Sequence, residues 1–186
     1  SEPQVEGELV NNQTLITDKS MQQSLELKGY GELTHSQFFL KPFESLYLMY
    51  CDKLKLFKGK KRIDFDSLME TCIKYDVESL SKFLIYRDLR TRGYTVKDGF
   101  GFGLDFRVYE RGDFGEKGAK YLVFGLSEGK QEKIGQLQKK IEQITQMGKE
   151  PIIAVIERRG EVIYYKISRM NFLENKDRLD MQKFKF

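Results

Sequence analysis

Histidine and cysteine are scarce in this sequence, and tryptophan is absent. One histidine and two cysteines occur among 186 residues. Neither Cys51 nor Cys72 lies in a CxxC motif or a Cys/His cluster, which argues against structural zinc and against a disulfide framework. We therefore expect a reducing compartment. The lone His35 has no nucleophile-and-acid arrangement around it, so we predict a surface or capping role and assign it no chemistry.

Long apolar runs are also missing. No segment approaches the roughly 18 apolar residues that a membrane span needs, and residues 1–13 lack a basic-then-apolar signal pattern. We expect a soluble, cytoplasmic protein with no membrane partner. With 40% hydrophobic and 13% aromatic residues, the chain can build the packed core of one ordinary domain or two small ones.

Basic charge is concentrated in the second half. Residues 1–82 carry 11 basic and 13 acidic side chains, whereas residues 83–186 carry 21 and 15, a net charge of +6. This surplus permits nucleic-acid binding without demonstrating it, and a solvated surface is the default alternative.

Residues 1–82 are predicted to form a small α/β domain. The apolar face of the second predicted helix includes Cys72, which we expect to be packed rather than reactive. The predicted elements are a strand at Ser24–Leu27, a helix from Pro42 to about Leu54, a helix capped by Asp64, and a helix at about Glu78–Arg92 that ends at Gly93 and leads into the second domain.

Residues 83–186 are predicted to form a second domain, with a mixed sheet and one long amphipathic helix packed on it. The whole chain is therefore expected to be α+β. The predicted strands are Tyr94–Val96, Leu104–Tyr109, Tyr121–Phe124, Ile152–Ile156 and Val162–Ile167, the helix is about Gln131–Met147, and Lys183–Phe186 is either an ordered edge or a frayed end.

Three glycines alternate with other residues in Asp98–Gly103. Their spacing is not GxGxxG and no helix pattern follows, so we reject a nucleotide-binding loop. Glycine at every second residue instead predicts a close approach of backbones between two strands.

Several dissimilar motifs occur in an order and spacing that resemble the archaeal tRNA-splicing endonucleases (tRNA-intron endonucleases). The resemblance covers most of residues 25–170. The motifs that carry it are Tyr86–Lys97, Phe102–Tyr109, Tyr121–Val123, Ala154–Ile156 and Gly160–Ser168 in the C-terminal domain, and Ser45–Leu48 in the N-terminal domain.

This resemblance implies cleavage of precursor tRNA at intron boundaries without a metal or other cofactor. The ribose 2′-OH attacks the adjacent phosphate and leaves a 2′,3′-cyclic phosphate and a 5′-OH. In the family a tyrosine is the general base, a histidine the general acid, and a lysine stabilises the phosphorane. By position the resemblance assigns the tyrosine to Tyr109 and the lysine to Lys149. From the residues alone, Tyr109 also fits packing at a strand end, and Lys149 a helix-end charge.

The expected histidine is absent. Three positions before the Tyr-Leu-Val strand, where the family has it, this chain has Gly118. Lys117 and Lys120 lie nearby and are predicted to contact RNA, but a lysine with a pKa near about 10.4 is a poor acid catalyst at neutral pH. Two explanations are open: a non-catalytic subunit that assembles with a His-bearing partner, or a substituted form of an active subunit.

Assembly is the second departure from the family. Family members pair through strand edges and an acidic loop, which here corresponds to Glu157–Glu161 and has no net charge. Because burying an unpaired arginine is costly, we expect a different receiving groove and a heteromeric rather than homomeric complex.

Two other functions remain open. Asp105 and the triplet Glu128-Gly129-Lys130 resemble the Asp…Glu-x-Lys pattern of metal-dependent DNA nucleases. The chain also fits a plain RNA-binding module that holds tRNA through the charge of residues 83–186.

Overall fold

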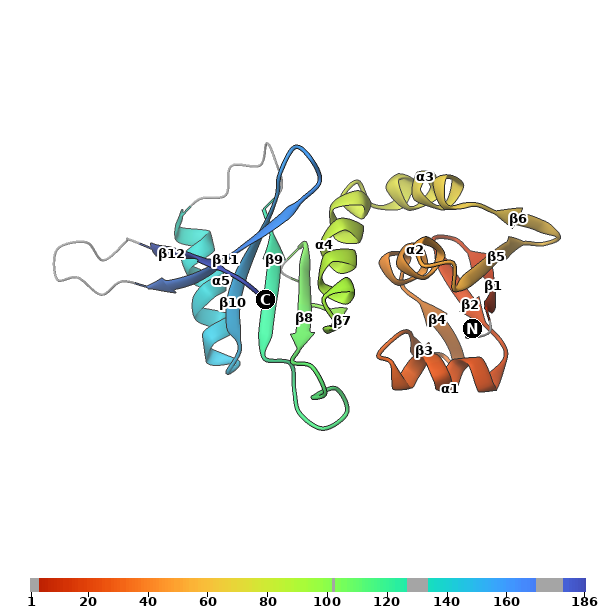
Figure 1. Ribbon diagram of the computed structural model, residues 1–186, viewed down its shortest axis with the longest axis horizontal. Coiled ribbons are helices and arrows are strands. Elements are labelled where there is room, and N and C mark those ends of the chain that lie inside the picture. The colour runs from red at the N-terminus through yellow and green to blue at the C-terminus, as the bar shows by residue number, and fades with distance from the viewer. Residues whose placement is uncertain (1–3, 102, 127–133, 170–178) are drawn as a thin grey trace. The chain divides into compact units, whose positions relative to one another are not determined.

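The computed structural model describes residues 4–101, 103–126, 134–169 and 179–186, and the chain divides into two compact units, Ser1–Arg87 and Asp88–Phe186. Each unit contains one six-stranded mixed sheet (Figure 1), which confirms the predicted α+β class. The domain boundary predicted at 82/83 falls inside helix α4 (Ser79–Thr91). The division into domains of residues 1–82 and 83–186 stays a prediction.

The first unit has a sheet of order β3-β4-β2-β1-β5-β6 in which β1 and β5 are parallel and the other pairs are antiparallel. Its strands are β1 (Val5–Val10), β2 (Gln13–Ile16), β3 (Glu32–Thr34), β4 (Gln37–Leu40), β5 (Leu54–Lys58) and β6 (Lys61–Ile63), and its other helices are α1 (Lys19–Leu27), α2 (Pro42–Tyr50) and α3 (Phe65–Tyr75).

The strand predicted at Ser24–Leu27 is wrong, because these residues form the end of α1. The Asp18 carboxylate accepts a hydrogen bond from the Met21 N–H at 3.1 Å and so caps the helix. Leu25 is buried, whereas Leu27 is 83% exposed. A polar-apolar alternation over four residues fits a strand, but it also fits a helix that buries one residue. The Asp18 cap at the start of α1 favours the helix.

The helices predicted after Pro42 and Asp64 are confirmed, although α2 ends at Tyr50, before the predicted Leu54. Asp64 accepts a hydrogen bond from the Ser67 N–H at 2.8 Å. The inward faces of these helices pack with the sheet around Leu46, Leu56, Leu68, Cys72 and Phe83. Burial raises the pKa of the Cys72 thiol to about 11, so this cysteine is packed rather than reactive.

The second unit has its strands in chain order, β7 to β12. Among its described strands only β9 and β10 pair in parallel, and the crossover between them contains α5. Helix α5 packs Ile141 and Ile144 against Leu122, Phe124 and Ile153 of the sheet. The elements are β7 (Thr95–Asp98), β8 (Asp105–Tyr109), β9 (Tyr121–Gly125), α5 (Ile134–Gln146), β10 (Glu150–Ile156), β11 (Val162–Arg169) and β12 (Leu179–Phe184).

The predicted strands of this unit are confirmed, and Tyr121–Phe124 is buried throughout, as a strand covered on both faces requires. The chain's last residues form an ordered edge. Phe184 lies in β12, and the ring of Phe186 packs on those of Tyr94 and Tyr164 at centroid distances of 5.1 and 4.7 Å.

One buried hydroxyl joins α4 to β11 within the second unit. Tyr164 is 3% exposed and donates a 2.6 Å hydrogen bond to Asp88 Oδ2, which also pairs with Arg92 Nε at 3.0 Å. Burial, and then the bond to Asp88, raise the pKa of Tyr164 above its ordinary value.

We expect Tyr164→Phe to destabilise the fold by about 1–3 kcal/mol in urea unfolding at pH 7, because it removes a hydrogen bond to a charged group. The unfolded chain ionises this hydroxyl near pH 10 and the folded chain only at higher pH. The difference between wild type and variant should therefore shrink as the pH rises above about 10. The control is Tyr165→Phe, at the neighbouring, partly exposed position; an equal effect of both variants would contradict the prediction.

Candidate active site

Three neighbouring strands bring the predicted site residues to one end of the second sheet. Because β8 is antiparallel to β9 and β9 is parallel to β10, the end of β8 meets the beginnings of β9 and β10. The Lys120 N–H donates to Val108 O at 3.0 Å, and the Glu150 N–H donates to Lys120 O at 2.9 Å. Tyr109, the loop of residues 110–120 and Lys149 therefore share this end of the sheet.

Lys149 reaches across to the loop that contains Gly118. Gly148, with φ 75°, turns the chain out of α5, and the Lys149 N–H closes this turn on Ile144 O at 3.2 Å. The Lys149 ammonium then donates a 2.9 Å hydrogen bond to the Ala119 carbonyl, in the residue after Gly118. The side chain is thus directed at the loop, which a simple helix-end charge does not require.

Tyr109 is partly exposed at the end of β8. It follows the fully buried Val108, so its side chain projects from the opposite face of the strand. Its ring packs edge-on against that of Phe114 with centroids 5.1 Å apart. This contact orients the ring, and a catalytic role for Tyr109 or Lys149 stays a prediction.

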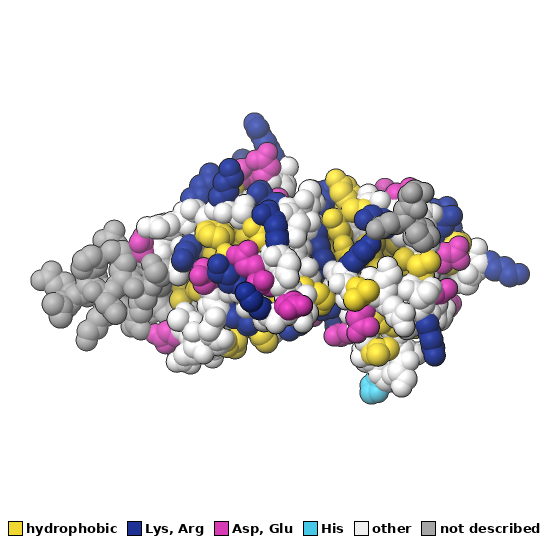
Figure 2. All heavy atoms as spheres, turned by 60° about the horizontal axis from the view of Figure 1, so that its bottom comes forward, with side chains coloured by type: hydrophobic (Ala, Val, Ile, Leu, Met, Phe, Trp, Pro, Cys, Tyr) yellow, Lys and Arg dark blue, Asp and Glu magenta, His cyan; other side chains and the backbone are white. Residues whose placement is uncertain are grey.

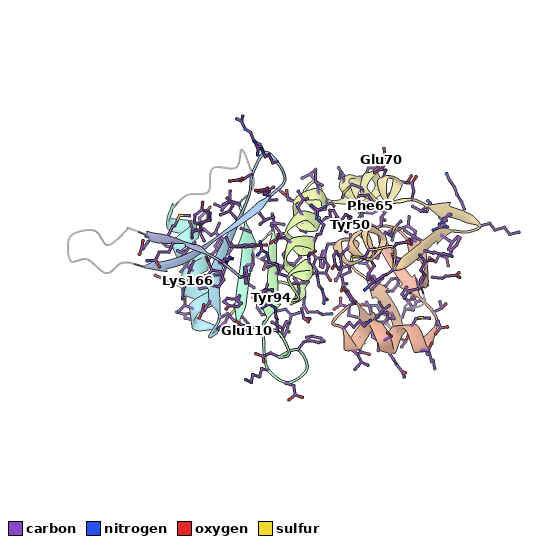
Figure 3. The ribbon with its side chains drawn as sticks, in the orientation of Figure 1. Tyr50, Phe65, Glu70, Tyr94, Glu110 and Lys166 are labelled. Carbon is purple, nitrogen blue, oxygen red and sulfur yellow. The ribbon has the colours of Figure 1, made fainter. Side chains whose placement is uncertain are left out.

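A carboxylate that the sequence did not single out lies next to Tyr109. Glu110, labelled near the end of β8 in Figure 3, accepts hydrogen bonds from Tyr121 Oη at 2.8 Å and from Lys120 Nζ at 3.3 Å. The bond from Tyr121 lowers the pKa of Glu110, with a smaller effect of Lys120. Hydrogen bonds with Tyr121 and Glu110 raise the pKa of Lys120, which makes its ammonium an even poorer proton donor. In the sequence, the one sign of this contact is the Tyr121 hydroxyl, at the start of the otherwise apolar strand β9.

The backbone conformation at position 118 does not require glycine. Gly112 and Gly115, earlier in the same loop, have φ of 82° and 87°, where other residues are strained. Gly118 is exposed, its φ lies outside this left-handed region, and a Cβ placed on it would meet no other atom within 4 Å among the described residues. A histidine at this position would therefore fit without strain.

The two predicted RNA-contacting lysines differ. Lys117 is exposed, whereas Lys120, with 48% of its side chain exposed, is paired with Glu110. Figure 2 shows Lys and Arg side chains interspersed with Asp and Glu on the face that it presents. Binding of RNA by Lys117 and Lys120 stays a prediction.

The lone histidine lies elsewhere. His35 occupies the turn between β3 and β4 in the first unit, with φ 50°, and is exposed. It belongs to a different unit from Tyr109 and Lys149. The prediction that His35 carries no chemistry is consistent with this position.

Of the Asp…Glu-x-Lys pattern of metal-dependent DNA nucleases, the structure describes only the aspartate. Asp105 is 3% exposed and accepts a hydrogen bond from the Phe100 N–H at 2.7 Å, so it supports a loop. The triplet Glu128-Gly129-Lys130 lies outside the described residues. Within the described ranges, no group of three His, Cys, Asp or Glu side chains is placed to hold a metal ion.

The strands β10 and β11 form an antiparallel hairpin around the Glu157–Glu161 loop. The Glu157 N–H donates to Glu161 O at 2.8 Å, and Gly160, with φ 81°, makes the turn. Arg158 and Arg159 are exposed at its tip. Insertion of this hairpin into another subunit stays a prediction.

No helix in the described part of the chain is long and apolar enough to cross a membrane.

Comparison with known proteins gives matches over both units. Residues 79–164 match the family described as tRNA intron endonuclease, catalytic C-terminal domain, and residues 5–69 match the corresponding N-terminal domain. A tRNA-splicing endonuclease of Methanococcus vannielii is 34% identical over 164 residues, which cover 88% of this chain and 93% of the relative. One of Thermococcus onnurineus is 32% identical over 155 residues, covering 83% and 90%.

Proposed function

Because this chain belongs to the tRNA intron endonuclease family, we propose that it is a subunit of an assembly that cleaves precursor tRNA at intron boundaries, and that its own site lacks the general acid. The proposal that this site lacks its general acid rests on Gly118. It occupies the position of the family's histidine, while Tyr109 and Lys149 lie at the same end of the sheet.

The proposed reaction is an internal transesterification. Tyr109 accepts the proton of the ribose 2′-OH as this oxygen attacks the neighbouring phosphorus. The bond to the 5′ oxygen of the next nucleotide breaks, which leaves a 2′,3′-cyclic phosphate and a 5′-OH. The Lys149 ammonium stabilises the negative charge of the phosphorane. The departing oxygen needs a proton, and Gly118 has none to give.

No neighbouring lysine replaces this acid well. The pKa of Lys120 is raised by its hydrogen bonds with Tyr121 and Glu110, so the proton is held more firmly than in a free lysine. Losing one positioned acid typically slows a reaction by about 10²–10⁴-fold. We therefore propose that cleavage in the assembly takes place at a second subunit that carries the histidine.

The neutral hairpin Glu157–Glu161 supports a heteromeric assembly. Its exposed Arg158 and Arg159 would be costly to bury in a groove shaped for an acidic loop, so the receiving groove should supply carboxylates. A partner of this chemistry is a second family member, distinct from this chain.

Reconstitution tests this proposal. Mixed with a family member that carries histidine at the position of Gly118, the chain should form a complex that cleaves intron-bearing precursor tRNA. The cut should survive EDTA, because the nucleophile is the substrate's own 2′-OH, and mapping of the products should find 2′,3′-cyclic phosphate ends. Cleavage that EDTA abolishes, or cleavage of DNA, would support the metal-dependent alternative instead. Equal binding of intron-containing and intron-free tRNA would argue against specific recognition of introns.

A further inference from the structure

The glycine loop between β7 and β8 presents an aromatic side chain at the surface. Phe100 is 46% exposed. The proposed reaction assigns this loop no task.

A hydrogen bond to a buried carboxylate holds the Phe100 backbone in place. Its N–H donates to the carboxylate of the buried Asp105 at 2.7 Å, and a Cβ on Gly99 would overlap that carboxylate. The predicted close approach of backbones is therefore seen at Gly99, where a Cβ would also lie 2.8 Å from the backbone carbonyl carbon of Asp105. At Gly101 and Gly103 no atom of the described residues crowds the Cβ, and their φ of 87° and 102° is what favours glycine. The hydrogen bond to Asp105 and the close approach at Gly99 together restrict the backbone at Phe100.

Two cations lie over the Phe100 ring. The Arg107 guanidinium is 5.4 Å from its centroid and is itself fixed by a 2.7 Å hydrogen bond from Nε to Asp98 O. The Lys149 ammonium is 5.9 Å from the centroid and also binds Ala119 O. The ring is thus a neighbour of the lysine that the proposed function assigns to phosphate binding at this chain's own site.

We propose that Phe100 is a stacking platform for a base of the precursor tRNA, and that it positions the nucleotide whose phosphate lies at Lys149 and Arg107. Proteins bind unpaired nucleotides with aromatic side chains for the bases and cations for the phosphates, and the Phe100, Arg107 and Lys149 group has both. A protein partner packed on Phe100 would have to desolvate the same two cations, so RNA is the better fit. This proposal rests on the proposed function.

Binding of the full-length chain to intron-bearing precursor tRNA tests the platform. Phe100→Ala should weaken binding by about 5- to 100-fold, as loss of one stacked base does. Phe100→Tyr should keep the wild-type affinity, whereas Phe100→Leu, apolar but not aromatic, should behave like alanine. The slope of log K against log salt should stay unchanged in these variants, because no phosphate contact is lost, and should fall by about one unit in Lys149→Ala. Tyr75→Ala, at a 59% exposed aromatic of α3, is the matched control and should bind as wild type.

The possible outcomes distinguish failure of the Phe100 platform from failure of the proposed function. If wild type binds precursor tRNA and Phe100→Ala or Phe100→Leu binds equally well, the platform is refuted and the proposed function stands. If wild type does not bind precursor tRNA even in the reconstituted assembly, the proposed function fails with it. A change of oligomeric mass in Phe100→Ala, with unchanged affinity for RNA, would assign the ring to a protein contact and overturn the platform. Melting curves of each variant check that the fold is intact.

Discussion

Replacing Gly118 with histidine should raise the rate of precursor-tRNA cleavage by this chain about 10²–10⁴-fold, the usual contribution of one positioned general acid. The position accepts a side chain, because its φ is ordinary and a Cβ would meet no other atom within 4 Å among the described residues. The Ala119 carbonyl beside it binds the Lys149 ammonium, so the new imidazole would enter the loop to which the lysine is directed. Single-turnover cleavage of an end-labelled substrate measures the gain.

Two controls accompany Gly118→His. Gly118→Ala stiffens the loop without adding an acid, and Glu116→His adds an imidazole two residues away on the same exposed loop. Neither should accelerate cleavage. Because a general acid must carry its proton, the gain from Gly118→His should decline as pH rises through about 6.5, the ordinary pKa of an imidazole. A folded Gly118→His protein that binds RNA but cleaves no faster would show that more than the acid is missing, and would assign the chain a purely structural role.

Removing either of the two groups with proposed catalytic roles, the Tyr109 hydroxyl or the Lys149 charge, should abolish what the histidine restores. In the Gly118→His background, we expect Tyr109→Phe to slow cleavage about 10²–10⁴-fold and Lys149→Met about 10²–10³-fold. Tyr109→Phe keeps the ring that packs on Phe114 and removes only the hydroxyl. Because such groups act together, the double variant should cost little more than the more damaging single one.

The matched controls for these two variants lie on the first unit. Tyr75→Phe removes the hydroxyl of an exposed tyrosine, and Lys58→Met removes an exposed lysine charge. Both should leave the cleavage rate of Gly118→His unchanged. Equal losses in the controls, or full activity of Tyr109→Phe, would contradict the assigned roles.

The sequence was most informative where local chemistry decides the structure. The helix starts at Pro42 and Asp64 and the end at Gly93 follow from fixed φ, side-chain capping and left-handed φ, each of which needs only a few neighbouring residues. The error at Ser24–Leu27 arose because a four-residue alternation carries little information. Strand β1 was not predicted, since it pairs in parallel with β5, far along the chain, and Gly7 interrupts its inward row.

From the sequence, the residues of the candidate site could be predicted, but most of the contacts between their side chains could not. Once β8, β9 and β10 are paired, chain order alone brings Tyr109 and Lys149 to one end of the sheet. The contact of Glu110 with Tyr121 depends on how side chains are directed across neighbouring strands, and that of Phe100 with Lys149 on the path of a glycine loop. No spacing in the sequence encodes these contacts, so both were missed.

The claim that this chain's own site lacks its general acid is tested most directly by the wild-type protein alone. Its single-turnover rate constant on intron-bearing precursor tRNA should be measured beside that of Gly118→His, with the mass of each sample determined by light scattering. We expect the wild-type chain to cleave at least about 100-fold more slowly than Gly118→His at neutral pH. A wild-type chain that by itself forms a tetramer and cleaves as fast as the histidine variant would contradict the account.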